Sequence, residues 1–435
     1  MRVLLICPDY VSQYNPLLAI GQALREHSEA AIIVATGAGL APKVIADGFD
    51  YTELLLGNGS NRGVLDEMGM ARITMAIDAT RHGMLAILRH QALMRLNSLL
   101  WNPIEVASNI RKLLSRYQPD LVINVQISYN STAALLALRA PFATVITGHP
   151  TEFPQQHEMY GFPYVLPQQF RLDKLELQEL AALCSEAQTQ FTKEFNHVLS
   201  QINPYTTVVS NALATASRDL LLLNYPEELG RYRKSALPDH AYFVGPLLRK
   251  ELLPIDICEW LDAVRPDLPT IYLSFGTVLS MRSDVLHSIV DALRSEPLRV
   301  VIASGVANLD EWESLPAHWL VRPYLPQVAI MSHVDLVICH GGNNTITECL
   351  GFGVPLLIAP FSSDQFAGAA DIERNGLGLV FDPNNTSPSQ IRDLMYQAMD
   401  CRPLAVALAE KLKAKPGARQ AANLCAHFLN INSAS

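Results

Sequence analysis

Several features that define other protein classes are scarce in this chain or missing from it. Charged residues make up only 17% of the 435 residues, and the formal net charge is −9. No run of Lys or Arg offsets that charge, which argues against a nucleic-acid partner. No uninterrupted apolar run reaches the length of about 18 residues that a transmembrane helix needs. We therefore expect no membrane span.

Cysteine is also sparse and poorly placed for metal binding or cross-linking. The seven cysteines stand singly, and no Cys-x-x-Cys pair occurs. This spacing indicates neither a zinc site nor a disulfide framework, and it fits a reducing compartment. At the N-terminus, residues 3–7 form an apolar run that is too short for the core of a signal peptide. We expect a cytoplasmic protein that begins with a β-strand.

What the sequence does have is an alternation of short apolar runs with longer amphipathic segments, which is typical of a parallel sheet covered by helices. Strands are expected at 3–7, 30–35, 121–125, 143–146, 270–273, 300–303, 336–339 and 354–359. Helices are expected at 15–27, through most of 61–117, at 283–293 and from Asn344 onward. The length of the chain indicates two α/β domains. We expect two Rossmann-like sheets that face one cleft, with a boundary near 230–245.

The segment from Asp335 to Glu348 is the richest in chemistry. A buried strand ends at His340, two glycines allow the backbone to approach a ligand, and a helix begins near Asn344. The N–H groups and the dipole of a helix start favour an anion, most often a phosphate. Glu348 lies one turn beyond Asn344, where a carboxylate can accept hydrogen bonds from ribose hydroxyls. The alternative is an ordinary capped helix that follows a tight turn.

The surroundings of this segment resemble the donor-binding signature of the family 1 UDP-glycosyltransferases, which have the GT-B fold. The family's aromatic-x-Pro-Gln stands at 324–327, and its His-x-Gly-x-Asn-Ser/Thr-x-x-Glu stands at 340–348. Gly-Val-Pro follows at 353–355, and Asp-Gln follows at 364–365. One element departs from the pattern, because Tyr324 replaces the usual Trp, although an aromatic face remains. The resemblance implies a bacterial enzyme of the natural-product or small-molecule type.

The resemblance also implies a role for each matching position. Tyr324 would stack on uracil, and Gln327 would contact its edge or the ribose. The diphosphate would be held by Gly276, Thr277, His340, Gly342, Asn343, Asn344 and Thr345. Glu348 would accept the ribose hydroxyls, while Asp364 and Gln365 would bind hydroxyls of the sugar. No metal or other cofactor is expected, since the chain has no Asp-x-Asp element.

These donor residues narrow the expected substrate. An intact Glu348 is best used by a nucleotide with both ribose hydroxyls, which favours UDP over dTDP. The pair Asp364 and Gln365 suits a sugar with several free hydroxyls, because buried acceptors without partners are costly. We therefore expect UDP-glucose, or another UDP-hexose, as the donor. The expected reaction is inverting transfer to a hydroxyl of a small-molecule acceptor by a monomer or homodimer.

The first half of the chain departs from the family at the catalytic base. The family usually has Gly-His-x-x-Pro after the first strand, and here Gln13 stands at the His position on the acceptor side. The Asp that often accompanies this His aligns with Val125. Glutamine cannot accept a proton at neutral pH. We expect His149 or Asp9 to act as the base instead. The alternative is that His149 is an ordinary turn residue and that Asp9 caps a helix or turn.

The resemblance divides the chain into an acceptor-binding domain at 1–235, a donor-binding domain at 245–415 and a C-terminal helix at 416–435 that returns to the first domain. Two other functions stay open. One is a non-catalytic partner protein that binds a sugar nucleotide, and release of UDP with any acceptor would argue against it. The other is a sugar-nucleotide epimerase on the same fold, which would turn over the donor without an acceptor.

Overall fold

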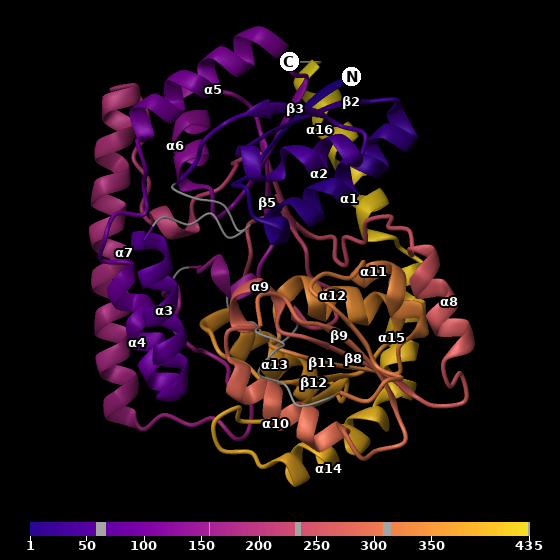
Figure 1. Cartoon of the computed structure of the whole chain (residues 1–435). Helices are drawn as coiled ribbons and strands as arrows, with labels where there is room; N and C mark the ends of the chain where they lie inside the picture. The colour runs from indigo at the N-terminus through magenta and orange to yellow at the C-terminus, as the bar shows by residue number, and fades with distance from the viewer. Residues whose placement is uncertain (58–66, 156, 231–235, 308–314, 434–435) are drawn as a thin grey trace.

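The computed structural model describes residues 1–57, 67–155, 157–230, 236–307 and 315–433 (Figure 1). Two sheets form its framework, and every strand pair in both sheets is parallel. Most of the strands are short apolar runs that are buried on both faces, as in sheets covered by helices on either side. The predicted α/β architecture is confirmed.

The first sheet has seven strands in the order β3-β2-β1-β4-β5-β6-β7. They are β1 (Arg2–Ile6), β2 (Ala31–Thr36), β3 (Asp50–Glu53), β4 (Leu121–Val125), β5 (Ala143–Ile146), β6 (Leu220–Leu223) and β7 (Ala241–Phe243). The order reverses at β1, so β1 and β4 lie at the switch point. In an open parallel sheet, ligands bind beyond the carboxyl ends of the strands at that point.

Seven α-helices accompany the first sheet in the described part of the chain. They are α1 (Val11–Ser28), α2 (Ala41–Ala46), α3 (Glu67–Arg81), α4 (Met84–Met94), α5 (Pro103–Tyr117), α6 (Tyr129–Leu138) and α7 (Lys174–Ile202). From residue 67 onward, the predicted helical stretch is three helices, because Gly83 at φ +91 and Pro103 interrupt it. The long helix α7 runs beside α4, which in turn packs against α3 (Figure 1).

The second sheet has six strands in the order β10-β9-β8-β11-β12-β13. They are β8 (Thr270–Ser274), β9 (Arg299–Ala303), β10 (Leu320–Arg322), β11 (Leu336–Cys339), β12 (Leu356–Ile358) and β13 (Gly378–Val380). Its helices are α8 (Ile255–Ala263), α9 (Gly276–Leu279), α10 (Ser283–Leu293), α11 (Gln327–Ile330), α12 (Asn343–Phe352), α13 (Ser363–Arg374), α14 (Pro388–Met399) and α15 (Arg402–Lys413). Here the order reverses at β8, so β8 and β11 flank the switch point.

The last helix, α16 (Gly417–Ser433), lies with the first half of the chain (Figure 1). It packs beside α1, and Ala421 and Cys425 belong to the same buried apolar cluster as Leu17. The limits of the three predicted domains stay predictions. In the described residues, no helix is both long and apolar enough to cross a membrane.

The two halves also share apolar and polar contacts. One buried cluster contains Leu88 of α4 together with Tyr272 and Val337 of the second sheet. Arg282 is fully buried and donates to Thr80 of α3 at 3.0 Å. These contacts place the carboxyl ends of both sheets against one another, with a cavity between them.

Candidate active site

A cavity of about 810 Å³ lies between the two sheets and is lined by residues of both halves. The described residues that line it include most of the predicted site: Gln13, Gly276, Tyr324, Gln327, His340, Gly342, Asn343, Asn344, Thr345, Glu348, Asp364 and Gln365. The side chain of Thr277 lies outside the described part of the structure. The structure thus brings the donor signature to one place, while the role of each residue stays a prediction.

The start of α12 forms one wall of this cavity. Gly341 has φ +83, a conformation that favours glycine, and it lets the chain turn from β11 into the helix. His340 has a buried Nδ1 without a hydrogen-bond partner, and burial lowers the pKa of its ring to about 4. The ring is therefore neutral at neutral pH and carries one N–H. A Cβ on Gly342 would lie 2.5 Å from His340 Nε2, so this position must be glycine for the ring to stay.

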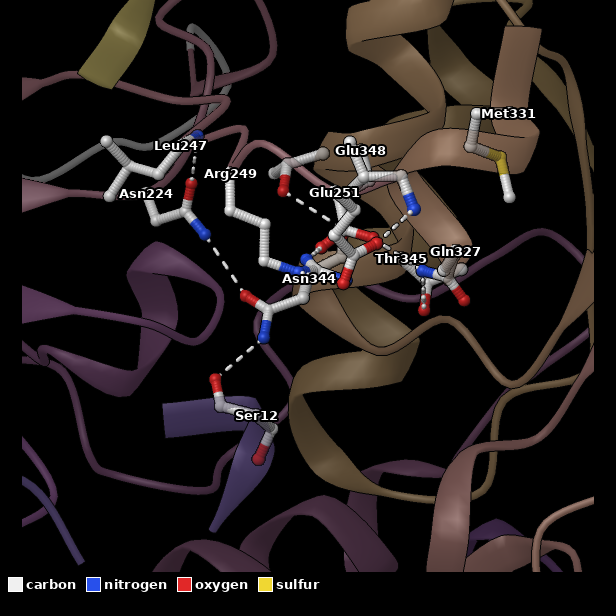
Figure 2. Close-up of polar contacts among 12 residues, drawn as sticks. Ser12, Asn224, Leu247, Arg249, Glu251, Gln327, Met331, Asn344, Thr345 and Glu348 are labelled. Carbon is white, nitrogen blue, oxygen red and sulfur yellow. Dashed lines mark hydrogen bonds and ion pairs between the residues drawn. The ribbon is translucent and has the colours of Figure 1, made fainter. Parts of the chain in front are cut away.

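The side chains of the first two residues of α12 connect the two halves of the chain. Asn343 Nδ2 donates to the carbonyls of Thr147 at 2.8 Å and Asn224 at 2.9 Å. Asn344 Nδ2 donates to the carbonyl of Ser12 at 2.7 Å, and its Oδ1 accepts from Asn224 at 3.1 Å (Figure 2). Asn343 thus uses both N–H groups of its amide, whereas Asn344 keeps one, and the backbone N–H groups of the helix start are also available to an anion.

Glu348 lies in a buried cluster of charges (Figure 2). Arg249 Nη1 donates to Glu348 Oε1, and Gln327 Nε2 donates to Oε2 at 2.6 Å. Arg249 Nε also donates to Glu251 at 2.7 Å. Burial raises the pKa of Glu348, while Arg249 and Gln327 oppose that shift. Each carboxylate oxygen has two lone pairs, so each retains one for a further hydrogen-bond donor.

The nucleobase and sugar positions differ in how free their side chains are. Tyr324 is 61% exposed, so its ring is available for stacking at the edge of the cavity. Gln365 caps α13, because its Oε1 accepts from the backbone N–H groups of Phe361 at 2.9 Å and Ser362 at 3.1 Å. Asp364 accepts from Ser362 Oγ at 3.2 Å, and burial raises its pKa.

On the acceptor side, the position of the family's base holds no ionisable group. Gln13 on α1 lines the cavity, and its Oε1 accepts from Thr147 Oγ1 at 2.5 Å. Val125 is fully buried at the end of β4. Neither of these two positions offers a group that can accept a proton at neutral pH.

The two predicted substitutes are not among the described residues that line the cavity. His149 is buried: its Nε2 lies 3.0 Å from Asp371 Oδ2, and its Nδ1 accepts from the backbone N–H of Thr151 at 3.2 Å. For His149 to act as a base, its ring would have to leave Asp371. The carboxyl of Asp9 lies against Gly37 after β2. Both roles stay predictions.

Known proteins are similar to this chain in sequence over part of its length and in fold over nearly all of it. Residues 286–423 match the model of the glycosyltransferase family 28 C-terminal domain. Two uncharacterized UDP-glucosyltransferases of Bacillus subtilis (strain 168) are similar: YdhE is 31% identical over 164 residues, covering 37% of this chain and 40% of that protein. YojK is 29% identical over 157 residues, covering 35% and 39%. The chain thus spans less than half the length of these relatives.

The crystal structure of the glycotransferase of kitacinnamycin superposes with a TM-score of 0.67 over 98% of each chain, at 17% identity. At that identity the likeness shows the fold. The chain has the GT-B fold, and its residues 286–423 are similar to the C-terminal domain of glycosyltransferase family 28. These matches support the predicted resemblance to family 1-type glycosyltransferases and confirm the predicted GT-B fold.

The structure adds site residues to this GT-B chain that sequence reasoning missed. Arg249 stands in no recognisable sequence motif. It contacts Glu348, which is 99 positions away in the sequence, only in the folded chain. Glu152, Tyr160 and Arg95 also line the cavity, on its acceptor side. The only sequence signal for Glu152 was its place beside His149, in a turn that follows a strand.

Proposed function

We propose that this chain is an inverting glycosyltransferase that moves a hexose, with glucose as the first candidate, from a UDP-hexose to a hydroxyl of a small molecule. The observation that supports it most is a single cavity with two different ends. The donor signature lines one end, and side chains of α3 and α4 line the other. A donor and an acceptor bound at these ends would meet inside the cavity.

The nucleotide end suits uridine. Tyr324 offers an exposed ring for the base, and Glu348 retains a lone pair on each oxygen for the two ribose hydroxyls. A nucleotide without the 2′-hydroxyl would leave one of these buried acceptors unused, which costs affinity. This difference supports UDP over dTDP as the donor nucleotide.

The leaving diphosphate would lie at the start of α12. The helix has ten residues, so its first N–H groups and its dipole can stabilise the charge that builds on the phosphate oxygens. The neutral ring of His340 also lines the cavity at that point. We propose that these groups act on the leaving diphosphate without a metal.

The acceptor end has an apolar wall beside its polar side chains. Ile77, Ile87, Leu99 and Ile127 line it, and Tyr129 adds an aromatic ring. Such a wall suits an apolar or aromatic acceptor, because its binding would bury apolar surface. The hydroxyl would attack the anomeric carbon from the face opposite the diphosphate, so an α-linked donor would give a β-glycoside.

The test is incubation with UDP-glucose and a panel of aromatic and aliphatic alcohols, followed by mass spectrometry. We expect a product heavier than its acceptor by one hexose and an equal amount of released UDP. Binding of UDP-glucose without release of UDP, whichever acceptor is added, would overturn the proposal in favour of a binding protein. Turnover of the donor without acceptor would overturn it in favour of an epimerase.

A further inference from the structure

Three carboxyl groups line the cavity among the described residues: Glu152, Glu348 and Asp364. Glu348 is tied to Arg249 and Gln327 at the nucleotide end. Asp364 lies at the start of α13, at the end where the donor sugar is expected. Glu152 is the one that projects from the acceptor half of the chain, so it is the carboxyl best placed to meet an incoming hydroxyl.

Glu152 is held by the turn that follows β5. It ends the short 3-10 helix Pro150–Glu152, and His149 caps that turn by accepting from the N–H of Thr151 at 3.2 Å. Its carboxylate lies directly over Gly148, where a Cβ would come within 1.8 Å of Oε2. Tyr160 donates its hydroxyl to Glu152 Oε1 at 3.3 Å. The carboxyl therefore has a fixed position against the backbone.

Three neighbouring side chains affect the pKa of Glu152: Asp364, Arg95 and Tyr160. Burial and the carboxylate of Asp364 raise the pKa of Glu152 to about 8, whereas Arg95 and Tyr160 lower it. Arg95 also stacks on the ring of Tyr160, with its Cζ 4.7 Å from the centroid, and Glu152 in turn raises the pKa of Tyr129. A general base works best when its pKa is close to the working pH.

We propose that Glu152 is the general base of the transfer, an inference that rests on the proposed function. The Glu152 carboxylate takes the proton of the acceptor hydroxyl while the hydroxyl oxygen bonds to the anomeric carbon. The bond between that carbon and the diphosphate oxygen breaks, and its electron pair leaves with UDP. The proton then passes from Glu152 to solvent. His149 is a positioning residue, which holds the turn between Asp371 and Thr151.

The first test compares Glu152→Gln with Glu158→Gln, a change of the same kind in the same loop. Glu158 lines a separate pocket and accepts from the backbone of Gln155. Glu152→Gln should lower kcat by about 10²–10⁴-fold, the usual worth of general-base catalysis, and should leave the Kd for UDP unchanged. Glu158→Gln should keep parental kcat. A Glu152→Gln enzyme within about threefold of the parent would overturn the inference.

The second test uses phenols of graded acidity as acceptors, because an acceptor that is already ionised needs no base. The defect of Glu152→Gln should be largest for alcohols and should nearly vanish for the most acidic phenols. In the parent enzyme, kcat/KM with an alcohol should rise through about pH 8, and Glu152→Gln should lose that rise. An equal loss of activity in Glu152→Gln with every acceptor would mean that Glu152 has a structural role. A rise of kcat/KM with pH that is lost in His149→Gln and kept in Glu152→Gln would assign the base to His149.

A third variant displaces the Glu152 carboxylate without removing it. Gly148→Ala places a methyl group where Glu152 Oε2 now lies, so it should reproduce the acceptor-dependent loss while Glu152 is still present. Unchanged kcat in Gly148→Ala would contradict the fixed position of the base. If the parent chain transfers sugar to no acceptor at all, the proposed function fails, and the inference fails with it. If the parent is active and both variants are too, only the inference fails.

Discussion

Glu348 already accepts hydrogen bonds from Arg249 and Gln327, and Asn343 and Asn344 already bind backbone carbonyls of the first half. Residues of the donor signature therefore hold the site together as well as facing a ligand. Substitutions there will change both binding and stability. Each test at this scale needs a readout that separates the two effects.

Replacing Glu348 with Gln should weaken UDP binding by about 1–3 kcal/mol, because a carboxylate that accepts from ribose hydroxyls is lost. Calorimetry with UDP and dTDP measures it, and thermal unfolding reports the separate cost to the buried Arg249. The parent chain should prefer UDP, and the variant should lose that preference. Equal affinity of the parent for both nucleotides would contradict the role assigned to Glu348.

Replacing Asp364 with Asn should lower kcat/KM for UDP-glucose far more than it lowers UDP affinity, since its expected partner is the sugar. Steady-state kinetics and UDP calorimetry on the same preparation make the comparison. A parallel fall in both quantities would assign Asp364 to the structure of the α13 start instead.

The sequence was informative at this scale where one continuous segment carries the site. Residues 340–348 stand at fixed spacing on one strand end and one helix, so the pattern alone predicts that they lie together. Arg249 and Glu348 are 99 positions apart, and Tyr225 and Asp371 are 146 apart. Such pairs form only through the tertiary fold, and no local signal could predict them.

At the scale of elements, UDP binding is expected to depend on the start of α12, where β11 leads through a glycine turn into the helix. Gly342→Ala should lower UDP affinity at least about tenfold. The new methyl carbon would lie 2.5 Å from His340 Nε2 and would therefore displace the ring. Calorimetry measures the loss. Gly351→Ala in the same helix is the matched control, since its methyl group meets the side chain of Leu248 away from the cavity. A UDP affinity that is unchanged in Gly342→Ala would contradict this account.

Several elements were predictable because their apolar runs are bounded by strong turn signals. The expected strands at 121–125, 143–146 and 336–339 and the helix at 283–293 end where the structure ends them. The strand expected at 354–359 is shorter, Leu356–Ile358, because Pro355 and the Pro360 turn bound it. The helix α7 was not predicted, although its capping box at Asp173 and Glu176 is a sequence signal for a helix start.

At the scale of the whole molecule, α16 joins the end of the chain to the first half. Ala421→Asp would bury an unpaired charge between α16 and α1, and it should destabilise the protein by about 3 kcal/mol or more. Ala426→Asp, on the exposed face of the same helix, should cost little. Thermal unfolding of the two variants measures the difference. Equal melting temperatures would mean that α16 adds no stability to the first half.

The two halves meet around one cavity, and the proposed inverting transfer takes place across it. A donor bound along α12 would present its anomeric carbon to an acceptor held between α3 and α4. The hydroxyl would therefore approach from the side opposite the diphosphate.

The anomeric configuration of the product, measured by proton NMR after reaction with UDP-α-glucose, tests that account most directly. We expect a β-glucoside formed in equal amount to the UDP released, with no reaction when the acceptor is omitted. An α-glucoside, or a donor that is consumed without any glycoside, would contradict single-step transfer across this cavity.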